Sequence, residues 1–228
     1  MTRAAYAEAF PAVTGRPLIK LPQMAGRSES EIFFEALALN AADLSAGGDA
    51  DRLLERFSAE LAAALQARRD DLARQGRLLP GAAEAVAAVA NLDGAVQTVL
   101  TGSSRPNAML KLRAFGLDGF VDFDIGGYGS EAYPKGTLLG VARQRASDKH
   151  KVTFDQDVTV YVADSPRDVD AARIGGARSL AVASGRATAA ELRDAGADAV
   201  LPDLTDTAGL TALIARLTEP SSRYPEII

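Results

Sequence analysis

The strongest constraint on the fold is an alternation of short β-branched runs with helical segments that begins after Pro80-Gly81. The runs that predict strands lie at residues 96–100, 120–125, 158–163, 179–182 and 199–201. Alternating strand and helix favours a parallel sheet that is covered by helices on both faces. We therefore predict an α/β, Rossmann-like core domain over residues 78–220, followed by a tail at 221–228.

The first 77 residues carry no strand-like pattern and predict a separate helical domain. Ser28-Glu29-Ser30-Glu31 has the spacing of a capping box, which predicts a helix from there through Leu39. Apolar residues three and four positions apart predict an amphipathic helix over 49–73. We therefore predict a small helical domain over residues 1–77, ahead of the α/β core.

The inventory of reactive side chains is narrow. None of the 228 residues is cysteine, and the one histidine, His150, lies in a polar segment typical of a solvated loop. Disulfides, thiol nucleophiles, histidine-based triads and multi-histidine zinc sites are therefore excluded. Carboxylates, hydroxyls, lysines and arginines remain, and oxygen ligands of this kind suit Mg²⁺.

Charge and hydropathy exclude two further classes. The net charge is −5 and the basic residues are scattered, which argues against a nucleic-acid groove. The first ten residues contain no apolar signal region, and no apolar run approaches the ~18 residues of a membrane span. We expect a cytoplasmic protein that binds neither nucleic acid nor membranes.

Polar residues follow three of the predicted strands, where ligands sit in open α/β sheets. The first group is Thr101-Gly102-Ser103-Ser104, which follows the strand at 96–100. A hydroxyl and exposed amides ahead of a helix form a natural phosphate cradle. The alternative interpretation is a strand exit with Ser104 as a helix N-cap.

The second feature is Lys135, which follows Pro134 at the start of a predicted helix. A cation there opposes the helix dipole by roughly 0.3–1 kcal/mol. A residue that breaks a local rule is a functional candidate. The alternative is a solvated lysine.

The third feature is the pair Asp164 and Asp168, four residues apart after the strand at 158–163. We predict that this strand is buried, so the Asp164 carboxylate needs a cation or hydrogen-bond donors. Helix capping is the alternative, and it explains Asp168 better than Asp164.

The order and position of these groups resemble the haloacid dehalogenase superfamily, in the helical-cap, phosphoglycolate-phosphatase-like branch. The resemblance covers essentially the whole chain. The residues that carry it are Leu100-Thr101-Gly102-Ser103-Ser104, Tyr133-Pro134-Lys135-Gly136, Val162-Ala163-Asp164-Ser165-Pro166-Arg167-Asp168 and Ala171-Ala172-Arg173-Ile174-Gly175-Gly176.

The resemblance implies a reaction in which an aspartate attacks phosphorus and water hydrolyses the aspartyl-phosphate. It implies that Thr101 binds a phosphoryl oxygen with help from the amides of Gly102 and Ser103. Lys135 would neutralise the charge of phosphate and nucleophile. The implied substrate is a small phosphorylated metabolite, bound by a monomer or homodimer.

The resemblance also implies a magnesium site. Asp164 would hold Mg²⁺, and Asp168 would support the metal or its waters. The family usually has glycine where this chain has Ala163, which is a minor departure because alanine is also small.

A larger departure concerns the nucleophile. The family's opening strand, an apolar run ending in Asp-x-Asp-x-Thr, has no counterpart here, and residues 1–6 match the start of a cap helix. We expect a shortened start rather than an evolved loss, and an inactive chain as it stands. A lost central strand would leave a gap of about twice the ~4.8 Å strand spacing. Either the sheet closes this gap, another segment fills it, or it remains as a groove.

Several functions remain open. The first is a Mg²⁺-dependent phosphatase of a small phosphate monoester, in which Arg27 at the entrance of a cap helix either contacts the substrate or lies on the surface. The second is a non-catalytic phosphate-binding or interaction protein. A phosphomutase of the same superfamily is the third. Dehalogenation, which needs no Mg²⁺, is disfavoured by Lys135 and the aspartate pair.

Overall fold

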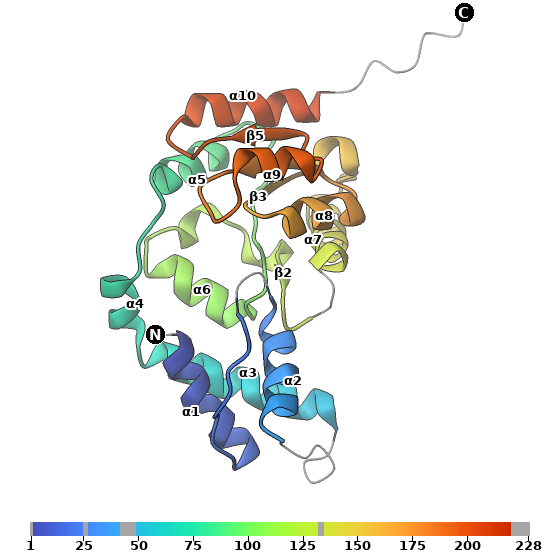
Figure 1. Cartoon of the computed structure of the whole chain (residues 1–228). Coiled ribbons are helices and arrows are strands. Elements are labelled where there is room, and N and C mark those ends of the chain that lie inside the picture. Colours follow the sequence, from blue (N-terminus) through green and yellow to red (C-terminus); the bar gives the residue numbers. More distant parts are fainter. Residues whose placement is uncertain (1, 25–26, 42–48, 132–134, 220–228) are drawn as a thin grey trace, which may run out of the picture. The chain divides into compact units, whose positions relative to one another are not determined.

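The computed structural model describes residues 2–24, 27–41, 49–131 and 135–219. The chain forms two compact units (Figure 1). Unit 1 comprises Met1–Arg77, Thr101–Gly119 and Tyr128–Tyr133, and unit 2 comprises Leu78–Leu100, Phe120–Gly127 and Pro134–Ile228. Within the described ranges, no helix combines the length and apolar character needed to cross a bilayer.

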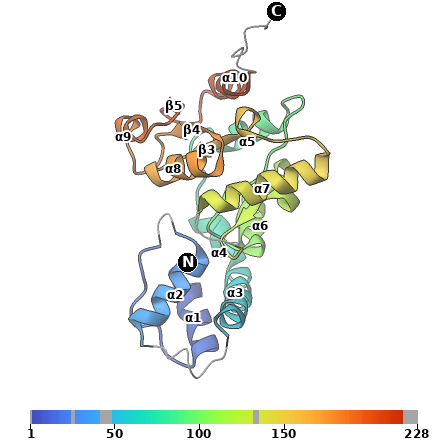
Figure 2. The ribbon, with the colours of Figure 1, turned by 90° about the vertical axis from the view of Figure 1, so that its right-hand side faces the viewer.

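Unit 1 is built from helices. These are α1 (Thr2–Thr14), α2 (Glu29–Leu39), α3 (Ala50–Gln66), α4 (Arg69–Gln75) and α6 (Arg105–Arg113). Helices α1, α2 and α3 lie side by side in Figure 2 and share an apolar core. At its centre the rings of Phe33 and Phe57 stack with centroids 4.2 Å apart, and Tyr6 meets Phe57 edge-on at 5.4 Å.

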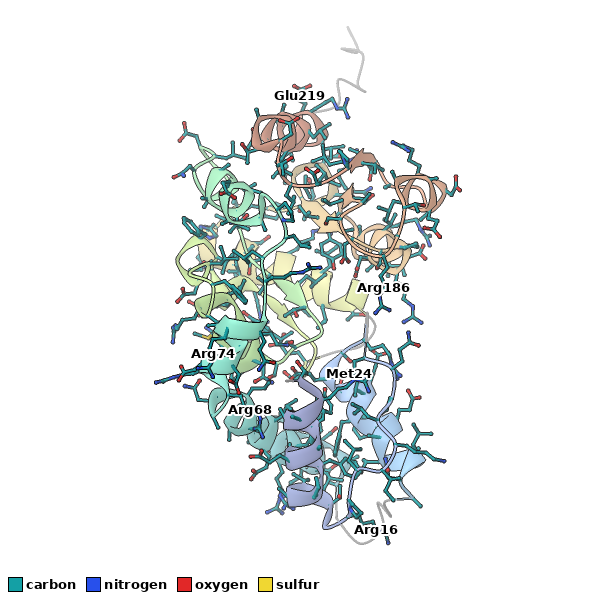
Figure 3. All side chains as sticks on the ribbon, turned by 60° about the vertical axis from the view of Figure 1, so that its left-hand side comes forward. Arg16, Met24, Arg68, Arg74, Arg186 and Glu219 are labelled. Carbon is teal, nitrogen blue, oxygen red and sulfur yellow. The ribbon has the colours of Figure 1, made fainter. Side chains whose placement is uncertain are left out.

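Local signals set the helix boundaries of unit 1. The predicted capping box is present: the Ser28 hydroxyl accepts from the Glu31 amide, and the Glu31 carboxylate accepts from the Ser28 amide. The single helix predicted over 49–73 is instead two, because the chain bends between α3 and α4 at Arg68. The Arg68 guanidinium also binds Glu8 of α1 at 2.5 Å (Figure 3).

Unit 2 contains a parallel three-stranded sheet in the order β3 (Val160–Ala163), β4 (Arg178–Val182) and β5 (Ala199–Leu201). Val160 is in register with Arg178, and Leu180 is in register with Ala199. A separate two-stranded sheet joins β1 (Leu100–Thr101) to β2 (Gly127–Tyr128). The predicted α/β class with parallel strands is confirmed.

Helices cover both faces of the β3-β4-β5 sheet. Because side chains alternate along a strand, Leu180 and Val182 face the core formed with α5 (Ala82–Ala90) and α10 (Thr207–Thr218). Ala163 and Ala181 face the opposite core, which contains residues of α8 (Pro166–Gly175) and α9 (Ala189–Asp194).

Helix α7 (Lys135–His150) packs closely against α8. A Cβ atom added at Gly136 would lie 2.6 Å from Cγ2 of Ile174, and one added at Gly175 would lie 2.6 Å from Cβ of Leu139. The two glycines therefore allow the helix backbones to approach.

The strand predicted over 120–125 is wrong. Those residues form two 3₁₀ turns, Asp118–Phe120 and Phe123–Ile125. The Asp122 amide donates to the Gln97 carbonyl at 2.8 Å, and side-chain bonds add to this contact: Gln97 Nε2 donates to the Phe120 carbonyl at 2.9 Å, and Thr98 Oγ1 donates to the Asp122 carbonyl at 2.6 Å. The strand predicted at 96–100 is accordingly reduced to β1.

The prediction that the strand before Asp164 is buried is also wrong. Within the described residues β3 pairs with β4 on one side, and its other edge carries no strand. Val162 is consequently 46% exposed, and Asp164 is exposed. Because Asp164 is exposed, burial does not by itself require a cation beside its carboxylate.

Candidate active site

The two predicted metal-binding aspartates lie at the carboxyl end of β3. Asp164 directly follows the strand, and Asp168 lies in the first turn of α8. Both line one cavity of about 250 Å³ within unit 2. The other lining residues are Leu79, Leu100, Tyr161, Val162, Ala163, Val182, Ser184 and Leu204. The cavity thus has an apolar wall and an acidic end.

The Asp168 carboxylate is held by two hydroxyl groups. Tyr161 donates to Oδ1 at 3.2 Å, and Ser165 donates to Oδ2 at 2.7 Å. Ser165 is also the N-cap of α8, because its hydroxyl accepts from the Asp168 amide at 3.3 Å. Capping is therefore the role of Ser165, and the Asp168 side chain, on a residue that is only 5% exposed, is aligned beside the cavity instead.

Tyr161 is a half-buried member of this group. Burial raises the pKa of its phenol far above the usual range, and the negative charges of Asp168 and then Asp164 raise it further. The phenol is therefore a neutral hydrogen-bond donor at physiological pH. Its bond to Oδ1 orients the Asp168 carboxylate.

Asp164 lies against a glycine of the loop after β4. A Cβ atom built on Gly185 would lie 3.2 Å from Oδ2 of Asp164 and 3.2 Å from its carbonyl oxygen. That spacing is tighter than ordinary van der Waals contact, so a side chain at 185 would displace the carboxylate. Glycine leaves room for it.

The residues present fit a magnesium ion. Asp164 and Asp168 supply carboxylate oxygens beside a shared cavity. Mg²⁺ retains several waters and is usually bound through one or two carboxylates. In the described part of the chain no group of three or more His, Cys, Asp or Glu side chains is arranged to hold a metal, so this pair is a minimal donor set.

The predicted phosphate loop connects β1 to α6 in unit 1. The Thr101 hydroxyl accepts from the Ser103 amide at 3.1 Å, which closes a tight turn. The Ser103 carbonyl accepts from the Gly129 amide at 3.0 Å. Ser104 is the N-cap residue of α6 by position, but its side chain makes no capping hydrogen bond.

Gly102 lies beneath the segment that precedes α2. A Cβ atom at Gly102 would lie 2.4 Å from the Arg27 carbonyl oxygen and 2.9 Å from Cα of Ser28. This position therefore requires glycine for close backbone approach. The structure brings the loop and the backbone of Arg27 together.

The two predicted cationic residues have different surroundings. The Arg27 guanidinium forms ion pairs with Glu31 and Glu35 of α2. Lys135 is the first residue of α7, and its side chain lies outside the described part of the chain. Thr101, Gly102, Ser103 and Arg27 belong to unit 1, and Lys135, Asp164 and Asp168 belong to unit 2.

Three relevant residues were missed by the sequence analysis. Tyr161 holds Asp168, and Lys111 donates from Nζ to the Ser103 hydroxyl at 2.7 Å. Glu29 accepts from the Ser104 amide at 2.9 Å. The Lys111 contact follows from the spacing of two helical turns after Ser103, whereas nothing in the sequence links Glu29 to a loop 75 residues away.

Solved structures share this fold across nearly the whole chain. A hydrolase from Pseudomonas syringae is 21% identical, covers 93% of this chain and 91% of its own, and has a TM-score of 0.59. CbbY from Rhodobacter sphaeroides, solved with xylulose-1,5-bisphosphate, is 19% identical over 90% and 89%, with a TM-score of 0.56. A putative β-phosphoglucomutase from Bacteroides vulgatus is 14% identical over 96% and 85%, with a TM-score of 0.53.

Two sequence comparisons address the family of the chain. A comparison with curated proteins found no match. The family model of haloacid dehalogenase-like hydrolases matches residues 8–173, which include β1, the loop after it, β3 and most of α8. The chain therefore belongs to the haloacid dehalogenase-like hydrolase family.

Proposed function

We propose that the chain carries the site of a Mg²⁺-dependent phosphatase of the helical-cap, phosphoglycolate-phosphatase-like branch. The proposed substrate is a small phosphate monoester. The observation that carries this proposal is the shared cavity of Asp164 and Asp168, with Asp168 aligned by Tyr161 and Ser165. A carboxylate held by two hydroxyls beside a cavity is better suited to ligand binding than to helix capping.

Each part of the proposed site has one task. Asp164 and Asp168 would hold Mg²⁺, which when bound offsets negative charge on phosphoryl oxygens. Thr101 would donate its hydroxyl proton to a phosphoryl oxygen, next to the Gly102 and Ser103 backbone. Lys135 would add positive charge from the start of α7.

We also propose that residues 1–228 bind phosphate without forming an aspartyl-phosphate. Asp164 and Asp168 are the acidic residues that line the described cavity, and both are assigned to the cation. The Asp-x-Asp sequences that begin at Asp49, Asp122 and Asp155 have local roles, since the first aspartate of each accepts a backbone hydrogen bond at the start of a helix or 3₁₀ turn. None of the three resembles a nucleophile that follows a strand.

Titration calorimetry with inorganic phosphate, with and without Mg²⁺, tests the binding site. Binding should require Mg²⁺ and should be lost in Asp164→Asn. Asp170→Asn is the matched control, because Asp170 is an exposed residue of α8 that pairs with Arg173. Absence of phosphate binding in the wild-type chain would refute the proposed site.

A p-nitrophenyl phosphate assay tests whether the chain lacks a nucleophile. The 228-residue chain should show almost no turnover, with or without Mg²⁺. Mg²⁺-dependent turnover that Lys135→Ala abolishes would show that the chain contains its own nucleophile. Phosphate binding without turnover is also the behaviour of a non-catalytic phosphate-binding protein on this fold.

Phosphoryl transfer within one sugar phosphate is a second candidate function. It is favoured by the likeness in fold to the putative β-phosphoglucomutase from Bacteroides vulgatus. ³¹P NMR distinguishes the two reactions: a mutase converts one sugar phosphate into its positional isomer, whereas a phosphatase releases inorganic phosphate.

A further inference from the structure

Glu29, the first residue of α2, carries a carboxylate inside unit 1. The residue is only 7% exposed. Its Oε2 accepts from the Ser104 amide at 2.9 Å. Nδ2 of Asn107, a residue of α6 that is 1% exposed, lies 3.1 Å from Oε1 and 3.0 Å from Oε2. The carboxylate therefore receives donors from both the phosphate loop and the helix that follows it.

The backbone of Glu29 binds the same loop. Its amide donates to the Gly102 carbonyl at 2.7 Å. Gly102 and Ser104 flank Ser103, so one residue of α2 fixes the peptide groups on both sides of the turn. The Gly102 backbone is further confined by the Arg27 carbonyl, as described above.

The donors that Glu29 receives are neutral amides. Burying a carboxylate is costly unless charges or hydrogen bonds compensate. The basic residue at the entrance of α2, Arg27, pairs with Glu31 and Glu35. A neutral side chain would be cheaper to bury at position 29, so the carboxylate is explained by the strong acceptor oxygens it offers to the Ser104 amide and to Asn107 of α6.

The turn that Glu29 holds also directs the side chains of the loop. The Ser103 amide donates to Thr101 Oγ1, and the Ser103 hydroxyl accepts from Lys111 Nζ. The Gly102 carbonyl and the Ser103 amide belong to one peptide group, so if that group rotates, Thr101 Oγ1 loses its donor. The Ser104 amide, which the Glu29 carboxylate holds, belongs to the next peptide group and restricts rotation of the Ser103 backbone. The orientation of the Thr101 hydroxyl is therefore coupled to Glu29.

We propose that Glu29 is a positioning residue: its carboxylate locks the 101–104 loop into the conformation that presents the Thr101 hydroxyl to phosphate. The role of Thr101 rests on the proposed function. The locking of the loop rests on the contacts of Glu29 alone, so the two can be tested separately.

Two substitutions at position 29 compare a variant that loses the contacts of the carboxylate with a variant that keeps a contact to the Ser104 amide. Glu29→Leu removes both acceptor oxygens at similar volume. Glu29→Gln keeps one oxygen for the Ser104 amide. Its new N–H can donate to Asn107 Oδ1 once the Asn107 amide turns by 180°, because that oxygen is buried without a partner among the described residues. Glu60→Leu is the control, because Glu60 is an exposed residue of α3.

The first measurement is the NMR hydrogen-exchange rate of the Ser104 amide, with folding checked by circular dichroism. Glu29→Leu should raise this rate by about tenfold or more, whereas Glu29→Gln and Glu60→Leu should stay near wild type. If Glu29→Leu does not fold, Asn107→Leu replaces it, and a faster Ser104 exchange is expected there because the carboxylate loses one anchor. An unchanged Ser104 rate in the folded variant overturns the proposal.

The second measurement is the affinity for inorganic phosphate in the presence of Mg²⁺. Glu29→Leu should weaken binding by about tenfold, and Glu29→Gln should restore most of it. If the wild-type chain does not bind phosphate, the proposed function fails while the exchange rates still decide the role of Glu29. If the wild-type chain binds phosphate, and Glu29→Leu speeds the exchange of the Ser104 amide without weakening phosphate binding, the coupling of Glu29 to Thr101 is refuted.

Discussion

The Tyr161 phenol donates a hydrogen bond to Oδ1 of Asp168 at 3.2 Å, across the turn that joins β3 to α8. The bond links the last strand residues before the acidic end of the cavity to the first turn of the helix beyond it. One side chain thereby orients a carboxylate for which the sequence pattern leaves helix capping as the alternative to metal binding.

Tyr161→Phe removes this bond and keeps the ring. We expect the free energy of unfolding to fall by about 1–2 kcal/mol, because Oδ1 of the buried Asp168 loses a donor. Mg²⁺ affinity, measured by calorimetry, should fall several-fold as the carboxylate becomes less well oriented. Unchanged Mg²⁺ affinity together with lower stability would assign Tyr161 a structural role only.

Tyr6 is predicted to make the protein sensitive to alkaline pH. Burial, and then the charge of Glu29, raise the pKa of its phenol far above the usual value of about 10. The unfolded chain then loses this proton near pH 10 while the folded chain keeps it. The stabilising effect is complete below pH 10 and declines above it, by about 1.4 kcal/mol per pH unit for this one group.

Urea unfolding at pH 8 to 11 measures that decline, and Tyr6→Phe should make it shallower. At neutral pH the same variant should be at least as stable as wild type, because the Tyr6 hydroxyl is buried without a hydrogen-bond partner among the described residues. A pH dependence that Tyr6→Phe leaves unaltered would contradict the assignment.

Two glycines of α7 are expected to respond in opposite directions to alanine. Gly136→Ala should destabilise the protein by about 1–3 kcal/mol, because the new Cβ would lie 2.6 Å from Cγ2 of Ile174. Gly140→Ala should stabilise it by about 0.5–1 kcal/mol, because no atom lies within 4 Å of the new methyl group. Thermal unfolding of the pair decides this; equal shifts would show that α7 and α8 are not in close contact there.

The stacked pair Phe33 and Phe57 should dominate the stability of the helical unit. Phe57→Ala is expected to cost about 3–5 kcal/mol in urea unfolding, because Phe57 is fully buried at the centre of the core. Leu39→Ala on α2, where the side chain is 43% exposed, should change stability by less than about 0.5 kcal/mol. A small effect at Phe57 would mean that the core repacks around the cavity.

The sequence predicted features that neighbouring residues determine. The capping box at Ser28, the α/β class, the strands β3, β4 and β5, and the position of Asp164 at a strand end all follow from local patterns. The strand predicted over 120–125 does not form; the segment is instead held by the side chains of Gln97 and Thr98 and by the Gln97 carbonyl. Such bonds depend on residues more than 20 positions apart.

The sequence by itself determined which chemical groups the chain offers and where they stand along strands and helices, because periodicity and capping act over a few residues. Tertiary structure decided which of those groups meet. The burial of Glu29 against Ser104 and Asn107, and the exposure of β3 at a sheet edge, depend on how distant segments pack. Packing sets the solvation and hydrogen-bond partners of a side chain, and these determine whether a carboxylate caps a helix, binds a cation or holds a loop.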